Sequence, residues 1–375
     1  MQVRPSTLAI PIMITNSSYI RDCFLRFIHT KVIKRMEAAN LRVRDSTRDT
    51  RPRLLLPVSG GLSSLVLLHI LDVHVVDQVK RTGRPGFDLV VLAVDDGEYE
   101  ENELKVFLEH LKARYANHEF VFIPSTAPAS TKLSEQDSSH PGVLDMTNVL
   151  ASLKAPTSHS DIASLNLTHT IVRQAQRLHC DFILWGDTTT RLAEKILAST
   201  ALGRGATLPS LVNDGPTPYL IPGSPPNSTT TTFLYPMKDV FRKELVAYSS
   251  VIDLPVMSEK SRAPAAVVSS KNATIDRLMQ EYFASVEKDY PSIVANVVRT
   301  SSKLQIPPPN YHGSVACCEL CGVRVEPGMF GIHGWGGSQE ADDAGDATMA
   351  PVPPDPTSVT KRQLCYGCAR STLVA

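Results

Sequence analysis

A short apolar run that leads into a glycine- and serine-rich loop is the feature that most constrains this chain. Leu54-Leu55-Leu56-Pro57-Val58 is followed directly by Ser59-Gly60-Gly61-Leu62-Ser63-Ser64 and then by a long apolar segment. A continuous apolar run of this length is typical of a strand buried in a parallel sheet. A strand, a tight turn and a helix in this order predict one unit of an α/β fold.

The loop has the composition of an anion-binding turn. Gly60 and Gly61 allow a tight turn and a close approach of backbone to ligand. Amides at a helix start carry partial positive charge, and the hydroxyls of Ser59, Ser63 and Ser64 add donors. The loop lacks the lysine of a Walker A motif and does not match the dinucleotide fingerprint. The alternative is a plain turn in which a serine caps the helix.

Strand and helix patterns alternate along most of the chain. The predicted strands are residues 53–58, 88–94, 119–123, 182–185 and 233–235, and the predicted helices are residues 19–45, 62–79, 100–115, 165–178, 190–201 and 239–250. This order predicts a doubly wound parallel sheet covered on both faces. Ligands bind such sheets at the carboxyl ends of the strands, so the loops after Val58, Val94 and Trp185 are expected to meet.

Three regions are expected along the chain. Residues 1–50 form an N-terminal basic helical region, residues 51–270 form the α/β domain, and residues 271–375 form a helical and cysteine-containing tail. Stretches rich in serine, threonine and proline predict irregular insertions near residues 125–160 and 205–232.

Charge and apolar patterning narrow the class of protein. Lysine plus arginine balances aspartate plus glutamate, 38 against 38, so any nucleic-acid surface must be local. The apolar run from residue 62 to 76 contains His69, Asp72 and His74 and is too short to span a bilayer. No signal peptide is recognised near the N-terminus. A cytoplasmic protein without a membrane partner is therefore expected.

Two Cys-x-x-Cys pairs stand near the C-terminus. Cys318 and Cys321 form the first pair, and Cys365 and Cys368 form the second. Two such pairs complete a closed tetrahedral site of four thiolates, which predicts a structural zinc ion rather than a catalytic one. An iron–sulfur cluster, a redox-active pair and free cysteines are the alternatives, and Cys317 could replace Cys318 as a ligand.

The glycine loop is similar to the Ser-Gly-Gly-x-Asp-Ser loop of the PP-loop ATPase superfamily. The resemblance implies an adenine nucleotide alpha hydrolase-like sheet and a site for ATP or AMP. Those enzymes adenylate a carbonyl-type oxygen with ATP and release pyrophosphate. Here Ser63 stands in place of the aspartate. A hydroxyl is a poorer magnesium ligand than a carboxylate, so a degenerate nucleotide site formed by the five loop residues above is expected.

Segments further along the chain keep the order found in active tRNA thiolases of that superfamily. Their motif Gly-His-Asn-x-x-Asp-x-x-Glu-Thr is matched by Gly186 and Glu194, whereas Asp187 and Arg191 stand at the histidine and aspartate positions. A helix capped by a threonine explains this segment equally well. Three further segments have the family's order and spacing: Asp95-Asp96-Gly97, for which a plain turn is an equal alternative, Gly203-Arg204-Gly205, and the stretch from Tyr235 to Leu245.

With its altered motif positions and its cysteine pairs, the chain resembles the cytoplasmic tRNA 2-thiolation protein 2 family. The stretch from Arg21 to Lys31 looks like that family's N-terminal helix. Relatives carry further Cys-x-x-Cys pairs near the N-terminus, but here only Cys23 remains, with Ile20 at its partner's position. A second metal site is therefore not expected.

The resemblance implies a subunit that is required for 2-thiouridine formation at the tRNA wobble position and has no catalytic residue of its own. Its partners would be a catalytic thiolase subunit in a heterodimer, tRNA and a ubiquitin-like sulfur carrier protein. Two alternatives remain: an active ATP-dependent tRNA-adenylating sulfurtransferase, and a zinc-stabilised nucleotide-binding regulator. The basic residues of the first helix could contact RNA, although a solvated helix face is the more common outcome.

Overall fold

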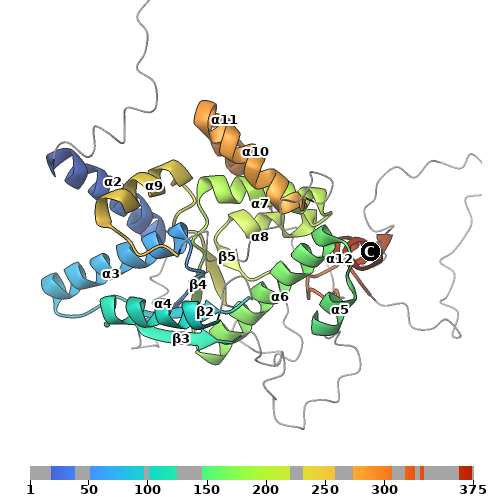
Figure 1. Ribbon diagram of the computed structural model, residues 1–375, viewed down its shortest axis with the longest axis horizontal. Helices are drawn as coiled ribbons and strands as arrows, with labels where there is room; N and C mark the ends of the chain where they lie inside the picture. The colour runs from blue at the N-terminus through green and yellow to red at the C-terminus, as the bar shows by residue number, and fades with distance from the viewer. Residues whose placement is uncertain are drawn as a thin grey trace, which may run out of the picture.

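A six-stranded sheet with helices on both faces forms the centre of the molecule (Figure 1). The computed structural model describes residues 18–38, 51–96, 101–124, 146–219, 231–257, 273–305, 317–325, 330–332 and 363–373. The strands are β1 (Arg53–Pro57), β2 (Asp88–Val94), β3 (Glu119–Ile123), β4 (Phe182–Leu184), β5 (Gly215–Pro216) and β6 (Thr232–Leu234). Their order in the sheet is β3-β2-β1-β4-β6-β5. All neighbours are parallel except β5 and β6, so the predicted parallel sheet is confirmed and gains a short antiparallel edge.

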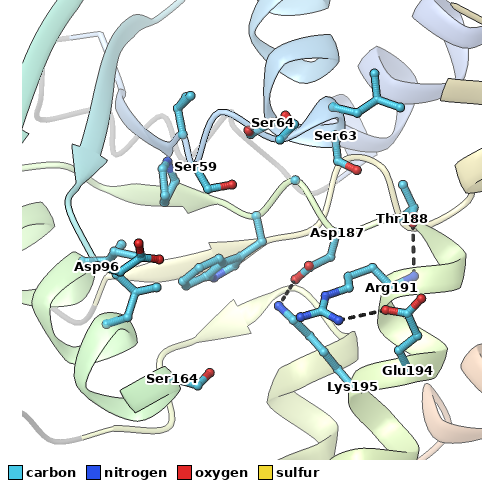
Figure 2. Close-up of a pocket in the computed structure, with 18 of the residues that line it drawn as sticks. Ser59, Ser63, Ser64, Asp96, Ser164, Asp187, Thr188, Arg191, Glu194 and Lys195 are labelled. Atoms are coloured by element: carbon cyan, nitrogen blue, oxygen red, sulfur yellow. Dashed lines mark hydrogen bonds and ion pairs between the residues drawn. The ribbon is translucent and has the colours of Figure 1, made fainter. Parts of the chain in front are cut away.

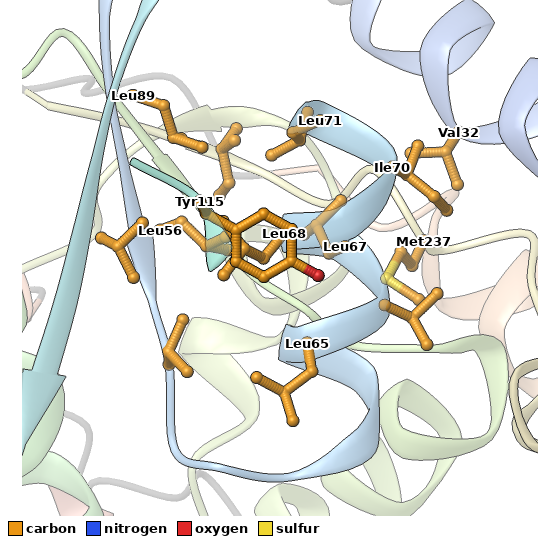
Figure 3. Close-up of a cluster of buried hydrophobic side chains, with 14 of the residues drawn as sticks. Val32, Leu56, Leu65, Leu67, Leu68, Ile70, Leu71, Leu89, Tyr115 and Met237 are labelled. Atoms are coloured by element: carbon orange, nitrogen blue, oxygen red, sulfur yellow. The ribbon is translucent and has the colours of Figure 1, made fainter. Parts of the chain in front are cut away.

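One face of the sheet carries the first hydrophobic cluster (Figure 3). Its helices are α2 (Ser18–Ala38), α3 (Leu62–Thr82), α4 (Glu101–Arg114) and α9 (Arg242–Ile252). Leu54 and Leu56 point into this cluster, whereas Leu55 between them belongs to the cluster on the opposite face. The alternation explains why the whole strand is apolar, because both of its faces are covered.

The second face is covered by helices from the middle and the end of the chain. They are α6 (Pro156–Arg177), α7 (Thr189–Ala201), α8 (Leu208–Val212), α10 (Ile275–Asp289) and α11 (Pro291–Ser301). Helices α10 and α11 pack on α7, so they are joined to the sheet through that helix (Figure 1). Phe283 and Val294 are fully buried in this layer.

The cysteine tail packs beside α6 and forms a third hydrophobic cluster. Helix α5 (Met146–Ser152) and helix α12 (Tyr366–Leu373) take part in it. Ile162 and Leu165 of α6 contribute the apolar surface on which Leu320 and Ala369 of the tail are buried. The tail is therefore tied to the α/β layers through α6.

Parts of the two segments predicted as irregular are regular in the structure. Helix α5 and the first turns of α6 lie within residues 146–160, and the 3-10 helix Gly205–Thr207, α8 and β5 lie within residues 205–216. Pro156 and Pro209 occupy the first turn of their helices, where proline costs no intrahelical hydrogen bond. Residues 125–145 and 220–230 lie outside the described residues.

Helix α3 is longer than the apolar run noted in the sequence. Its 21 residues and mean hydropathy of 1.4 would allow it to cross a membrane by length and composition alone. Leu65, Leu68 and Leu71 are buried in the first hydrophobic cluster, however. The helix is therefore explained as the core helix of this layer.

Candidate functional sites

A pocket of about 450 Å³ lies at the carboxyl ends of β1, β2 and β4 (Figure 2). The glycine loop, the residues that follow β2 and the residues that follow β4 all line it, and so do parts of α6 and α7. Val58, Val94 and Trp185 are among the lining residues. The loops after these three residues therefore meet as predicted.

The glycine loop turns sharply and is held from outside. Gly60 has φ 72°, a left-handed conformation that favours glycine. Its carbonyl accepts a hydrogen bond from the amide of Met257 at 3.2 Å, and an added Cβ at Gly60 would lie 2.7 Å from the Met257 sulfur. Met257, which follows α9 in the chain, thus holds the loop from outside.

The start of α3 has no side-chain cap among the described residues. Gly61 occupies the N-cap position, and no side chain accepts from the first-turn amides. Ser64 donates its hydroxyl to the carbonyl of Gly61 at 3.0 Å instead. The alternative in which a serine caps the helix is therefore wrong, and the amide end of α3 faces the pocket as an anion-binding terminus would.

Gly186 explains how closely β4 approaches this loop. A Cβ at Gly186 would lie 3.2 Å from the Cα and 3.3 Å from the amide nitrogen of Ser64. Both atoms belong to the backbone, so they cannot swing aside as a flexible side chain could. The glycine that matched the thiolase motif therefore serves here to let two backbones touch.

Two ion pairs occupy the wall of the pocket formed by α7 (Figure 2). The Lys195 ammonium donates to Asp187 at 2.6 Å, and the Arg191 guanidinium donates to Glu194 at 2.8 Å. Burial acts to lower the pKa of Arg191, but its hydrogen bond and charge pairing with Glu194 outweigh this and raise it. The two carboxylates on this wall are thus already matched by cations of the same helix.

Neighbouring groups fix the start of α7. The Thr188 hydroxyl accepts from the amide of Arg191 at 3.1 Å, which confirms the predicted threonine cap. Thr190 donates to Glu287 of α10 at 2.9 Å, and Glu287 also accepts from the amide of Lys243 at 3.2 Å. Helix α10 therefore holds the pocket ends of α7 and α9 in place.

The four predicted cysteines come together in the structure. The sulfur atoms of Cys318, Cys321, Cys365 and Cys368 all lie within 4.8 Å of one another, and Cys321 and Cys365 are 3.7 Å apart. Thiolates bound at about 2.3 Å to one tetrahedral ion lie about 3.8 Å apart. The cluster can therefore hold a metal ion. Cys317 is not a member of the group, and Cys23 is exposed on α2.

Local turns explain how each pair reaches its position. After the first pair, Gly322 has φ 67° and its amide donates to the Cys318 carbonyl at 2.8 Å. Cys318 donates its own amide to Val323 at 2.9 Å, which closes a small knuckle. The backbone of Cys365 pairs with that of Phe330 in an isolated antiparallel β-bridge, and Cys365 directly precedes α12. Hydrogen bonds within the group lower the pKa of Cys318 and raise the pKa of Cys321, because the four thiols share their protons with one another.

A buried ion pair ties this cluster to the α/β layers. Arg204 donates to both carboxylate oxygens of Asp161 on α6, each at 2.6 Å, and its third nitrogen lies 3.5 Å from the sulfur of Cys368. Ser371 of α12 donates to the same carboxylate at 2.5 Å. Burial acts to lower the pKa of Arg204, but the hydrogen bonds to Asp161 outweigh this and raise it. Arg204 thus remains charged beside the thiolates.

The turn around Arg204 is shaped to receive the tail. Gly203 has φ 74°, and an added Cβ there would lie 2.3 Å from the ring of Tyr366. A Cβ at Gly367 would lie 3.3 Å from the carbonyl of Gly203. His169 of α6 contacts the Cys321 carbonyl through Nε2 at 3.0 Å, and burial lowers the pKa of this histidine to about 4. The Gly203-Arg204-Gly205 turn, which matched a family segment in the sequence, therefore packs directly against the cysteine tail.

Some basic residues of α2 form ion pairs with other parts of the protein, whereas others are exposed to solvent. Lys31 pairs with Glu244 at 3.3 Å, and Arg35 pairs with Asp214 at 3.1 Å and donates to the Tyr235 carbonyl at 3.0 Å. These cations hold α2 against the layer that contains α9. Arg26 and Lys34 are exposed, so only part of the predicted basic face is open to a partner.

Several site residues were missed in the sequence. Trp185 and Arg242 line the pocket, although neither was among the site residues predicted from the sequence and Arg242 was noted only as part of a matched segment. The only sequence signal for Trp185 was its place at the end of a predicted strand, directly before the glycine of a matched motif. No sequence pattern marked Asp161 or His169, because their partners in the cysteine tail are 210 and 152 positions away in the sequence.

Comparisons with known proteins agree with the resemblance noted in the sequence. A family model described as cytoplasmic tRNA 2-thiolation protein 2 matches residues 274–370. The protein of that name from Phaeosphaeria nodorum is 41% identical over 93% of this chain and 88% of its own length. The one from Pyrenophora tritici-repentis is 38% identical over 96% of this chain and 91% of its own.

A solved structure shows the same fold. The U34-tRNA thiolase NcsA from Methanococcus maripaludis with its [4Fe-4S] cluster has a TM-score of 0.50 and 16% identity, over 84% of this chain and 88% of that chain. At this identity the likeness concerns the fold alone, and it confirms the predicted PP-loop type of sheet. On the identity and coverage of its relatives, the chain belongs to the cytoplasmic tRNA 2-thiolation protein 2 family.

Proposed function

We propose that this chain is a subunit of the cytoplasmic machinery that forms 2-thiouridine at the wobble position of tRNA. The observation that carries the proposal is membership of the family over nearly the whole chain, 93% of it at 41% identity to one relative. The family name agrees with the cytoplasmic location expected from the sequence. Its partners in this role are tRNA, a catalytic thiolase subunit in a heterodimer and a ubiquitin-like sulfur carrier protein.

The chemistry of the pocket favours a supporting rather than a catalytic role. Ser63 replaces the carboxylate of the active loop, and the carboxylates of Asp187 and Glu194 are paired with cations of α7. The cations paired with these two carboxylates compete with magnesium for their oxygen atoms. The loop keeps its turn and its amides, so it can still hold the phosphate of an ATP or AMP molecule without activating it.

The cysteine cluster is proposed to hold structural zinc. The mutual distances within 4.8 Å suit four thiolates on a single ion. In a four-iron cluster each thiolate sits on a separate iron, which spreads the sulfur atoms farther apart. Four protein ligands leave no open position, so the ion would fold the tail and not take part in a reaction. The four cysteines would be deprotonated on binding.

Deleting the protein and measuring tRNA nucleosides by mass spectrometry tests the role. We expect wobble 2-thiouridine to disappear and its 2-oxo counterpart to rise by the same amount, while modified nucleosides at other positions stay at their normal levels. Reintroducing the chain should restore the 2-thio group. Unchanged 2-thiouridine after deletion would exclude the proposed function.

An active ATP-dependent tRNA-adenylating sulfurtransferase is the second candidate, since the loop keeps a left-handed Gly60 and an uncapped helix start. Release of pyrophosphate from the purified chain with tRNA, with and without its partner, separates the two roles. Turnover by the chain alone, abolished by Gly60→Asp, would favour this second candidate.

A further inference from the structure

Trp185 lines the pocket directly after β4, and the sheet fixes its position. Its amide donates to the Leu234 carbonyl of β6 at 2.8 Å, which continues the pairing of β4 with β6. Its ring meets the ring of Phe233 at 5.4 Å and 81°, an edge-to-face contact. A backbone bond and an aromatic neighbour therefore hold the indole before any ligand arrives.

The polar edge of the indole is buried, although Trp185 is one of the residues that line the pocket. The indole Nε1 has no hydrogen-bond partner among the described residues. A ligand therefore meets the ring and not the N–H group. Flat rings are the natural partners of such a surface, because stacking uses the π face.

The rest of the pocket combines apolar side chains, the glycine loop and charged side chains of both signs. Val94, Leu167 and Ile171 give the lining an apolar part. Lys195, tethered to Asp187, lies 5.7 Å from the indole centroid, near the outer limit of about 6 Å for a cation–π contact. The same pocket contains the glycine loop and Arg242. Its volume of about 450 Å³ lies within the usual range of about 300–1,000 Å³ for ligand pockets.

We propose that Trp185 is a stacking platform for a nucleobase, so that the pocket holds one nucleotide with its base on the indole and its phosphate at the glycine loop. The inference rests on the proposed function's assignment of a degenerate nucleotide site to this loop. Because Ser63 is a poorer magnesium ligand than the carboxylate it replaces, we expect the nucleotide to bind without magnesium. The nucleotide is either free in solution or one residue of an RNA chain.

The chain offers its own reporter for this binding. It contains two tryptophans, Trp185 and Trp335, so the variant Trp335→Phe leaves the pocket indole as the sole source of tryptophan fluorescence. The full chain carrying this change is titrated with AMP, UMP, ribose 5-phosphate and an anticodon stem-loop RNA in buffer without magnesium. We expect quenching by the base-bearing probes and none by ribose 5-phosphate, which lacks a base.

The two sources of the nucleotide give different results. Quenching by AMP or UMP identifies a free nucleotide, and quenching by the stem-loop alone identifies an RNA base. Equal quenching by ribose 5-phosphate, or no quenching by any base-bearing probe, would refute the stacking role.

Affinity measured by equilibrium dialysis with the quenching probe gives an independent test. Loss of one base-stacking ring weakens binding by about 5- to 150-fold, so we expect this for Trp185→Ala and a change of only a few-fold for Trp185→Phe. Thermal melting checks that both variants fold. If the folded Trp185→Ala variant binds as tightly as the parent chain, the platform is excluded.

Nucleoside analysis separates this inference from the proposed function. Absent quenching together with lost 2-thiouridine in the deletion strain would reject the platform and leave the thiolation role standing. Clear quenching together with intact 2-thiouridine after deletion would reject the thiolation role and leave the platform standing.

Discussion

Helix α6 borders both the pocket and the cysteine cluster, but the two sites differ in which of their functional groups are free to act on a ligand. In the pocket the backbone features persist, with a left-handed Gly60 and a close contact at Gly186, whereas the charged side chains pair with one another. In the cysteine cluster all four ligand side chains are present within bonding range of one ion. The pocket is thus defined by the backbone shape of its loop, whereas the cysteine cluster is defined by a complete set of four ligand side chains.

Removing one metal ligand should give the largest effect. Cys321→Ser leaves three thiolates, and zinc contributes about 10–16 kcal/mol of apparent binding energy in isolated zinc-finger peptides. We expect loss of the bound metal, measured by elemental analysis, and a lower melting temperature. Cys23→Ser on the exposed face of α2 and Cys317→Ser beside the cluster are the controls and should keep the metal. Full metal content in Cys321→Ser would contradict the assignment.

Breaking the ion pair beneath the cluster should come next. Asp161→Asn leaves the buried Arg204 without its carboxylate, a change that typically costs about 3–5 kcal/mol. Urea unfolding measures the loss. The matched control is Glu281→Gln, which removes an exposed partner of Arg277 and should cost at most about 1 kcal/mol. Equal stability of the two variants would mean that the tail is not anchored through Asp161.

The close contact at Gly186 can be broken by one methyl group. Gly186→Ala places a Cβ 3.2 Å from the backbone of Ser64, and overpacking of this kind costs about 1–3 kcal/mol. Gly205→Ala is the control, since an added Cβ there meets nothing within 4 Å. We expect the difference in urea midpoints to appear with the metal still bound. A neutral Gly186→Ala variant would show that the loop can shift freely.

Acid should weaken the α2–α3 side of the molecule. Burial lowers the pKa of His29, His69, His74 and His118 below the ordinary value of 6.5, and in His118 this outweighs the opposing charge of Asp72. When the pKa of a group is lower in the folded state than in the unfolded state, its contribution to stability is fully present above the unfolded-state pKa. That contribution is lost as the pH falls through the folded-state pKa.

Melting temperatures measured from pH 7.5 downward should therefore decline once the pH passes below about 6.5. The double variant His69→Gln, His74→Gln should show a shallower decline than His110→Gln, which changes an exposed histidine on α4. Equal slopes for the two variants would rule out this origin of the acid sensitivity.

Restoring the missing loop carboxylate should have the smallest effect. Ser63→Asp recreates the loop sequence of active relatives, but the paired charges of α7 remain in place. We expect no pyrophosphate release above background with ATP and tRNA, measured alongside an active PP-loop enzyme. Measurable turnover would show that the loop alone had blocked catalysis.

The sequence predicted the features that depend on short stretches of chain. The strand before the loop, the threonine cap of α7 and the two cysteine pairs are all local patterns, and each is present in the structure. The role of Arg204 was not predictable, because it arises from a carboxylate on α6 and a sulfur on α12. Helix α5 was missed because its serine- and threonine-containing surroundings resemble a low-complexity segment.

The contact between the cysteine tail and α6 predicts the order in which these parts of the chain fold. Cys321 and Cys365 are separated by 44 positions, whereas Ser371 and its partner Asp161 are separated by 210. Closing the longer loop costs more chain entropy, and contacts between distant segments form slowly. We therefore expect the tail to capture its metal as a local event and to dock afterwards on a finished α6. A newly made chain would pass through a stage in which both parts are folded but not yet joined.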